Sequence, residues 1–146
     1  MDYCSIVWSF VPDSSLVRLQ RIQNKCMRVI LDCDFRSHRG DMLNDLSFMS
    51  IKQRIIFNRC ILMWKIVHGK SPQHLSANFT LNSNVSTYNT RSSNFNIYHD
   101  RVHSNSFNFK GTKSWNDLPH EMKSVTILSS FKRKCKEHIL KKMLMY

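Results

Sequence analysis

The closest pair of carboxylates in the sequence, Asp32 and Asp34, is the first candidate for chemistry. Phosphoryl-transfer polymerases hold Mg²⁺ with two or three carboxylates, because the metal ions neutralise charge on the attacking and leaving oxygens. Here the pair follows the expected end of a helix, with no apolar strand beside it. We interpret it as a solvated turn and predict neither a catalytic residue nor a metal site.

Histidine and cysteine do not supply a reactive group either. Structural zinc sites need four ligands in short paired spacings, and the nearest approaches are Cys33 with His38 and His99 with His103. No local signature joins a cysteine nucleophile to a histidine base, and no glycine-rich stretch would cradle a phosphate. We therefore expect no cofactor and no enzyme activity from this chain alone.

The cysteines and the N-terminus bear on the compartment. The five cysteines are odd in number, widely scattered and free of any C-x-x-C pair; they are Cys4, Cys26, Cys33, Cys60 and Cys135. This pattern favours a reducing compartment, where thiols pack as small apolar side chains. There is no signal-peptide pattern and no run of about 18 apolar residues. We expect a cytoplasmic or nuclear protein that is not secreted and has no transmembrane segment.

Positive charge is the strongest signal in the composition. The chain of 146 residues carries 22 Lys and Arg against 10 Asp and Glu, a net charge of +12 and a pI near 9.8. Such a charge attracts polyanions, so nucleic acid is the first expected partner and an anionic membrane surface the second. The hydrophobic fraction of 42% is sufficient for folding. Residues 1–146 are predicted to form one domain.

The first strong helical pattern places its charges on one side. An N-cap is expected among residues 13–15, and apolar residues then recur at Leu16, Leu19, Ile22, Cys26, Val29, Ile30 and Cys33. At about 100° per residue, Arg18, Arg21, Lys25 and Arg28 form a separate stripe roughly a third of a turn away. We predict that the helix buries its apolar side and presents this stripe to nucleic acid.

The remaining pattern predicts a mainly α fold of about four to six helices. The central helix is expected at 50–68, with Gly69 as its stop, after a shorter helix at 41–46. Ser71 and Pro72 open a short turn or helix. Residues 78–108 are rich in Asn and Ser and predict a long loop with at most short extended pieces, such as 95–98. Within WNDLP (115–119), Trp115 is expected in the core and Pro119 opens a short helix.

A last helix is expected from after Thr126 to about residue 144. Its inward positions are predicted to be Leu128, Phe131, Cys135, Ile139 and Met143. Lys132, Arg133 and Lys136 lie outside this face and are predicted to contact nucleic acid. The same helix could instead lie on a membrane surface, but its apolar face is modest and lacks Trp, so no membrane partner is expected.

Seven short segments of the sequence, taken in order, resemble a known protein family. They are DYCSIVWS (2–9), LQRIQNK (19–25), LNDLSFMSIKQR (43–54), KIVHG (65–69), YNTR (88–91), FKGTKSWNDLP (109–119) and SSFKRKCKEHI (129–139). Together they resemble the C-terminal, post-thumb segment of reverse transcriptases (RNA-directed DNA polymerases) from jockey-like non-LTR retrotransposons. The resemblance runs over essentially the whole chain.

The resemblance implies a place beside the catalytic core of the parent enzyme rather than within it. The aromatic-x-Asp-Asp motif of the palm is not in this sequence. The expected function is nonspecific binding to the backbone of RNA or an RNA/DNA duplex, with Arg91 of YNTR as a further contact and the missing polymerase core as a possible partner. The alternative is an inert retrotransposon remnant or a protein-interaction module.

Overall fold

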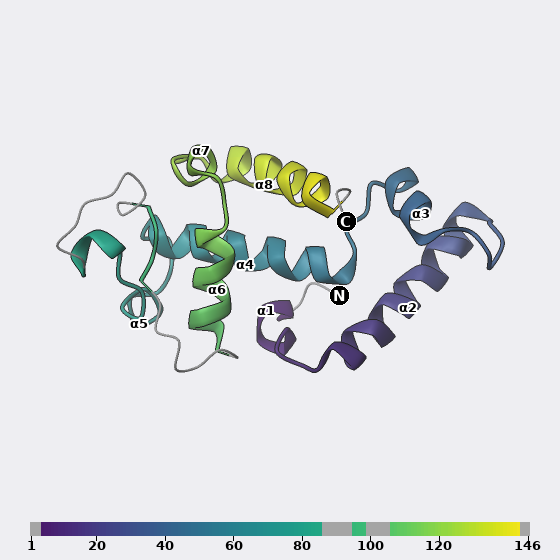
Figure 1. The fold of residues 1–146 in the computed structure, drawn as a ribbon, viewed down its shortest axis with the longest axis horizontal. Helices are drawn as coiled ribbons and strands as arrows, with labels where there is room; N and C mark the ends of the chain where they lie inside the picture. Colours follow the sequence, from purple (N-terminus) through teal and green to yellow (C-terminus); the bar gives the residue numbers. More distant parts are fainter. Residues whose placement is uncertain (1–3, 86–94, 99–105, 144–146) are drawn as a thin grey trace.

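The computed structural model describes residues 4–85, 95–98 and 106–143, and in these ranges the chain is mainly α-helical, as predicted (Figure 1). The helices are α1 (Ser5–Trp8), α2 (Asp13–Leu31), α3 (Arg39–Asp45), α4 (Ile51–Val67), α5 (Gln73–Ser76), α6 (Phe107–Asn116), α7 (His120–Lys123) and α8 (Leu128–Met143), with a 3₁₀ turn at Asn82–Asn84. The count over the described ranges exceeds four to six because α1, α5 and α7 are single turns of four residues.

Helix α4 lies at the centre and begins where the sequence predicts. Ser50 Oγ accepts a hydrogen bond from the Gln53 backbone N–H at 3.3 Å, and Gln53 Oε1 accepts one from the Ser50 N–H at 2.7 Å. This capping box satisfies two amides that the helix itself leaves unpaired. At the other end His68 is the C-cap, and Gly69 has φ 63°, a left-handed conformation that glycine adopts without steric cost.

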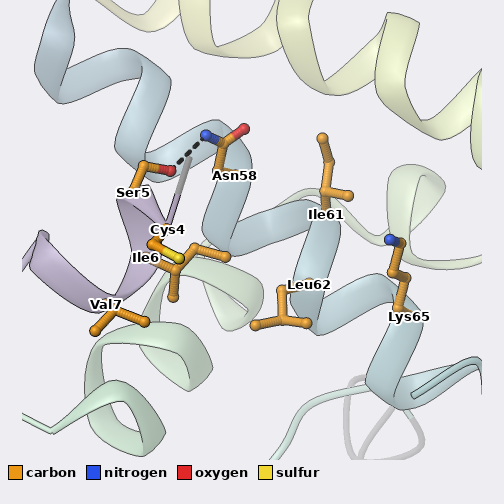
Figure 2. A pocket seen from close by; sticks show the side chains of 8 residues that line it. All are labelled: Cys4, Ser5, Ile6, Val7, Asn58, Ile61, Leu62 and Lys65. Atoms are coloured by element: carbon orange, nitrogen blue, oxygen red, sulfur yellow. Dashed lines mark hydrogen bonds between the residues drawn. The ribbon is translucent and has the colours of Figure 1, made fainter. Parts of the chain in front are cut away.

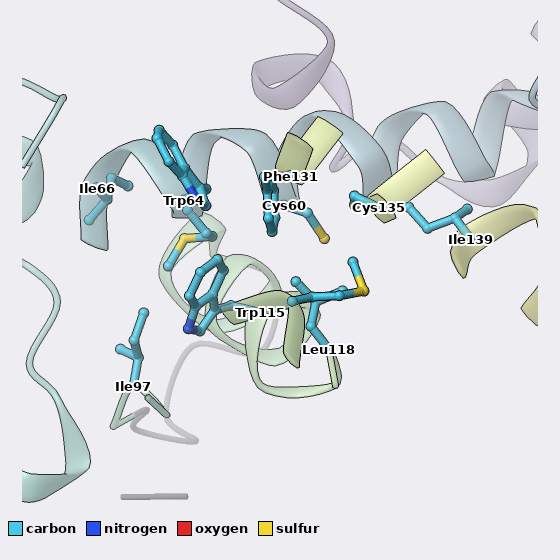
Figure 3. Close-up of a cluster of buried hydrophobic side chains, with 11 residues drawn as sticks. Cys60, Trp64, Ile66, Ile97, Trp115, Leu118, Phe131, Cys135 and Ile139 are labelled. Atoms are coloured by element: carbon cyan, nitrogen blue, oxygen red, sulfur yellow. The ribbon is translucent and has the colours of Figure 1, made fainter. Parts of the chain in front are cut away.

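The main core forms where α6 and α8 pack on α4 (Figure 3). Trp64, Trp115 and Phe131 are fully buried there, and the Phe131 ring lies 6.0 Å from each indole, centroid to centroid. Each indole N–H has a backbone acceptor: Trp64 Nε1 donates to Val125 O at 2.7 Å and Trp115 Nε1 to Phe95 O at 2.8 Å. The buried cluster is thus made of apolar side chains, and both of its indole N–H groups are satisfied.

Helix α6 was not predicted from the sequence, since the loop was expected to run to residue 108 and no helix was assigned to 109–116; the single turn α1 was not predicted either. Ser106 caps the helix, its Oγ accepting from the Phe109 N–H at 3.2 Å. Its residues lack a clear apolar period, so packing decides the conformation. A Cβ on Gly111 would lie 3.0 Å from Met63 Sδ, which means that α6 approaches α4 closely at this glycine.

Part of the predicted long loop is anchored. The Asn116 carboxamide bonds both backbone groups of Ile97, accepting from its N–H and donating to its carbonyl, each at 2.9 Å. Buried Lys123 donates from Nζ to Asn96 Oδ1 at 2.7 Å and to Asn116 O at 2.8 Å. Residues 95–98 make one isolated antiparallel bridge, Leu81 to Ile97, rather than a strand. As predicted, Trp115 is in the core and Pro119 opens a short helix, α7.

Helix α2 packs mainly against α3 and the start of α4, at one end of the molecule, with Trp8 of α1 against the same contact (Figure 1). A small cluster of Leu16, Ile51 and Ile55 joins α2 to α4. Two glutamines add polar contacts: Gln20 Oε1 accepts from the Ile51 N–H and Gln23 Nε2 donates to Met49 O, both at 2.9 Å. The helix begins one residue earlier than expected, because Pro12 occupies the N-cap and Asp13 is the first helical residue.

The prediction that α2 buries its whole apolar face is wrong. Leu16 and Met27 are its buried residues, whereas Ile22 is 49% exposed, Val29 82% and Ile30 58%. Nothing in the described part of the chain covers this side of the helix. The periodicity identified a helix correctly, but an apolar face is buried only where another element lies against it.

The cysteines, too, include both buried and exposed residues. Cys60 and Cys135 are fully buried in the main core, as expected for small apolar side chains, but Cys4 and Cys26 are exposed, contrary to the prediction. All five are free thiols. Among the described helices none has the length and apolar character needed to cross a membrane.

Candidate nucleic-acid interface

The basic stripe of α2, defined as Arg18, Arg21, Lys25 and Arg28, lies on the surface as predicted. The first three side chains are exposed and Arg28 is half-buried, with its Nε atom shielded from solvent and unpaired. At about 1.5 Å per residue the stripe is about 15 Å long, and at about 100° per residue it covers an arc of about 80°. The four cations therefore face one side of the helix in a single row.

Among the described residues, no carboxylate neutralises this row. In residues 4–85, 95–98 and 106–143, none of the four stripe residues makes an ion pair; the Asp13 carboxylate on the same helix binds Lys52 Nζ instead, at 3.1 Å. Four of the ten acidic residues fall in the segment 32–45, beyond the stripe. The positive charge of the stripe is therefore free to meet an anion.

Helix α8 carries the second set of basic residues that were predicted to contact nucleic acid. Lys132 and Arg133 are exposed and Lys136 is half-buried, and at about 100° per residue the three lie within an arc of about 100°. The adjoining side of α8 is buried through Phe131, Cys135 and Ile139, three of the inward positions that the sequence predicts. Leu128 is half-buried, and the Met143 side chain lies outside the described residues.

The structure does not merge the two basic sets into one surface. Helix α2 meets α4 at Ile51 and Ile55, near the start of α4, whereas α8 packs beside Cys60 and Trp64, farther along the same helix. They are therefore two separate basic surfaces. Arg91, the remaining predicted contact, lies outside the described residues.

One basic cluster was missed by the sequence analysis. Arg59 of α4 and Lys110 of α6 both lie over the Phe10 ring, with Arg59 Cζ at 5.6 Å and Lys110 Nζ at 5.2 Å from its centroid. Arg59 also donates to Ser9 O at 3.3 Å and to Ser9 Oγ at 3.0 Å. Burial lowers the pKa of Arg59 from its usual value. These residues come from three distant segments, so no local pattern could have joined them.

The carboxylate pair Asp32 and Asp34 lies in a turn, as expected. Asp32 ends α2 in a left-handed conformation, φ 48°, and Asp34 Oδ1 accepts a hydrogen bond from the Phe35 N–H at 2.6 Å. Both residues are exposed. Within the described ranges, no group of three or more metal-ligating side chains comes together.

A groove of about 390 Å³ lies between α1 and α4 (Figure 2). Apolar side chains such as Ile6 and Leu62 line it, together with Lys65. The Ser5 hydroxyl in it accepts a hydrogen bond from Asn58 Nδ2 at 2.8 Å, and a carboxamide cannot act as the general base that a serine nucleophile needs. Nothing in the lining of this groove indicates catalysis.

No protein-family model matches the chain, and no curated protein or solved structure matches it either. The fold and the surface define the class: a small, mainly α-helical domain with basic side chains exposed along α2 and α8. What such a surface can do is attract polyanions and contact their phosphates. Such contacts do not distinguish one base from another, because the cationic side chains bind phosphates rather than base edges.

Proposed function

We propose that this chain binds the phosphate backbone of RNA or an RNA/DNA duplex without reading its sequence, and that the basic stripe of α2 is the principal contact. In this proposal the chain is a segment of a retrotransposon reverse transcriptase, as its sequence strings suggest. It assists the polymerase core and has no polymerase activity alone.

The observation that carries the proposal is the exposed and unpaired state of the stripe. A cation held by a neighbouring carboxylate has little net charge to offer a phosphate, and Arg18, Arg21 and Lys25 have no such neighbour among the described residues. Their row of about 15 Å matches about four phosphate steps of one duplex strand, at 3.4 Å each along the axis. Guanidinium groups also bind phosphate with two parallel hydrogen bonds.

Helix α8 supplies a second, weaker contact in this proposal. Lys132, Arg133 and Lys136 face one side, but Lys136 is half-buried and lysine binds phosphate as a point charge. Exposed Lys134 and Lys141 lie on the other side of α8 and do not extend this set. We therefore expect charge changes on α2 to weaken binding more than equal changes on α8.

The test is charge reversal in a binding assay with a structured RNA. The double variant Arg18→Glu/Lys25→Glu should lower affinity at least tenfold at moderate salt, because it removes two cations from the row and adds two anions. The matched control is Lys113→Glu/Lys141→Glu, which makes the same change in net charge at two exposed lysines outside the stripe. It should change affinity by no more than about threefold, the effect of net charge alone.

The alternative is an inert remnant whose basic faces meet only water. That hypothesis predicts equal RNA retention for the wild type and both double variants. If the control variant instead weakens binding as much as the stripe variant, attraction is due to net charge and α2 is not a site. Either outcome would overturn the proposal.

A further inference from the structure

Beside the basic stripe, α2 has an apolar patch that its own fold leaves uncovered. We define the patch as Ile22, Cys26, Val29 and Ile30, all of which are exposed. Isolated apolar residues are normal on a protein surface, but these four are spaced at four, three and one residues and therefore adjoin one another on one side of the helix. A contiguous apolar surface of this kind marks an interaction site.

The three surfaces of α2 follow one another around the helix. With Asp13 set at zero and about 100° per residue, the basic stripe spans about 60–140° and the apolar patch about 160–260°. The buried side, with Leu16 and Met27, is centred near 310°. The patch is thus bounded by cations on one flank and by the body of the protein on the other.

A phosphate backbone does not account for the patch. Phosphates contact the cations, and they gain nothing from Val29 or Ile30. The patch needs an apolar occupant, and the stripe along its flank needs an anionic one. One ligand that satisfies both must carry apolar and anionic groups side by side, as a protein helix with Leu and Glu does.

A second copy of this chain fits poorly. In an antiparallel pairing of two α2 helices through their patches, like flanks meet, so the basic stripe of one copy would face that of the other. Each copy also carries a net charge of +12, which opposes self-association. Charge complementarity instead favours a different, acidic protein.

We propose that this face of α2 docks an amphipathic helix of a partner protein, with apolar residues against the patch and Asp or Glu along the flank that meets the basic stripe. From Ile22 to Ile30 the patch is about 12 Å long, enough for about two turns of a partner helix. The partner would also neutralise the stripe, so it would compete with RNA. This competition depends on the proposed function, whereas docking does not.

The probe is a synthetic helical peptide of about 18 residues with Leu at three- and four-residue spacing and Glu along one flank. A second peptide, with Lys replacing each Glu, tests the charge requirement. Binding to the whole chain is followed by fluorescence anisotropy. The rate of Cys26 alkylation, located by mass spectrometry, reports whether the peptide covers the patch, and exposed Cys4 on the α1 side is the internal control.

We expect the Glu peptide to bind and to slow alkylation of Cys26 but not of Cys4, and the Lys peptide not to bind. Ile22→Gln/Val29→Gln should weaken the Glu peptide about tenfold or more, because burial of these side chains is lost. The control Ile127→Gln changes a 62% exposed residue beside α8 and should have no effect. RNA affinity, measured separately, should change less than twofold in both variants, because Ile22, Val29 and Ile127 lie outside the stripe.

Other results would overturn the proposal. Equal binding of both peptides, or binding unaffected by Ile22→Gln/Val29→Gln, would mean that the patch does not select an acidic helix. Concentration-dependent dimers that dissociate in this variant would assign the patch to a second copy. Flotation with phosphatidylserine vesicles that is lost in this variant would assign it to a membrane. If the wild-type chain binds the Glu peptide but does not bind RNA, the proposed function is refuted and the docking proposal stands.

Discussion

The main core and the α2 end of the molecule have similar apolar sequence patterns but differ in how far their apolar side chains are buried. In the main core, Trp64, Trp115 and Phe131 are fully buried between three helices. Helix α2 has an equally regular apolar period, yet it buries Leu16 and Met27 and leaves Val29 82% exposed. The difference lies in the neighbours, since α4 is covered by α6 and α8, whereas α2 packs mainly against α3 and the first turns of α4.

This comparison separates two kinds of helix face. A face that another element covers stabilises the fold, and its residues are expected to be sensitive to any change in volume. A face that nothing covers adds little to stability and remains available for binding.

Trp115→Ala should cause the largest loss of stability. It removes a fully buried indole and its 2.8 Å hydrogen bond to Phe95 O, so the free energy of unfolding should fall by about 3–5 kcal/mol. Urea denaturation followed by circular dichroism measures this loss. A change below about 1 kcal/mol would mean that the main core does not carry the stability of the domain.

Leu16→Ala should cost less, about 2 kcal/mol, because its cluster is small and lies at the edge of the molecule. Native-state hydrogen exchange gives a second measurement. Amides in the second half of α2 should exchange faster than those in the middle of α4, since fewer buried contacts hold them. Equal protection in the two helices would contradict the division into a covered and an uncovered region.

Removing Cys60 should change the response to alkaline pH. A hydrogen bond with Cys135 and burial raise the pKa of the Cys60 thiol well above its usual 9.0. The folded chain therefore keeps this proton at a pH where the unfolded chain loses it, so stability falls as the pH rises above about 9. Comparing unfolding at about pH 8 and about pH 10, Cys60→Ala should lose less stability than the wild type. Cys26→Ala, at an exposed thiol in the other region, should lose as much as the wild type.

The parts of the fold that the sequence predicts are those with local signals. Helix α4 has Ser50 and Gln53 at its start and Gly69 at its end, and α8 has an apolar residue every three or four positions. Helix α6 has a cap at Ser106 but no clear apolar period, and it packs closely on α4 where Gly111 meets Met63, which is a tertiary contact. The uncovered face of α2 was mispredicted for the same reason, because periodicity cannot tell which neighbours a helix will have.

The candidate site also has features that the sequence predicts and features that it cannot predict. The exposure of Arg18, Arg21 and Lys25 follows from helical spacing and could be predicted. Their separation from the basic residues of α8 could not, because it depends on how both helices pack on α4. The placement of Arg59 and Lys110 around Phe10 likewise joins segments about fifty residues apart.

The salt dependence of RNA binding tests the central claim most directly. Each phosphate contact contributes a slope of about −0.9 for a duplex, or about −0.7 for a single strand, in a plot of log affinity against log salt concentration. Four contacts along α2 therefore predict a duplex slope of about −3 to −4, and Arg18→Glu/Lys25→Glu should make it shallower by about 2. A slope near zero, or one that this variant leaves unchanged, would contradict the account.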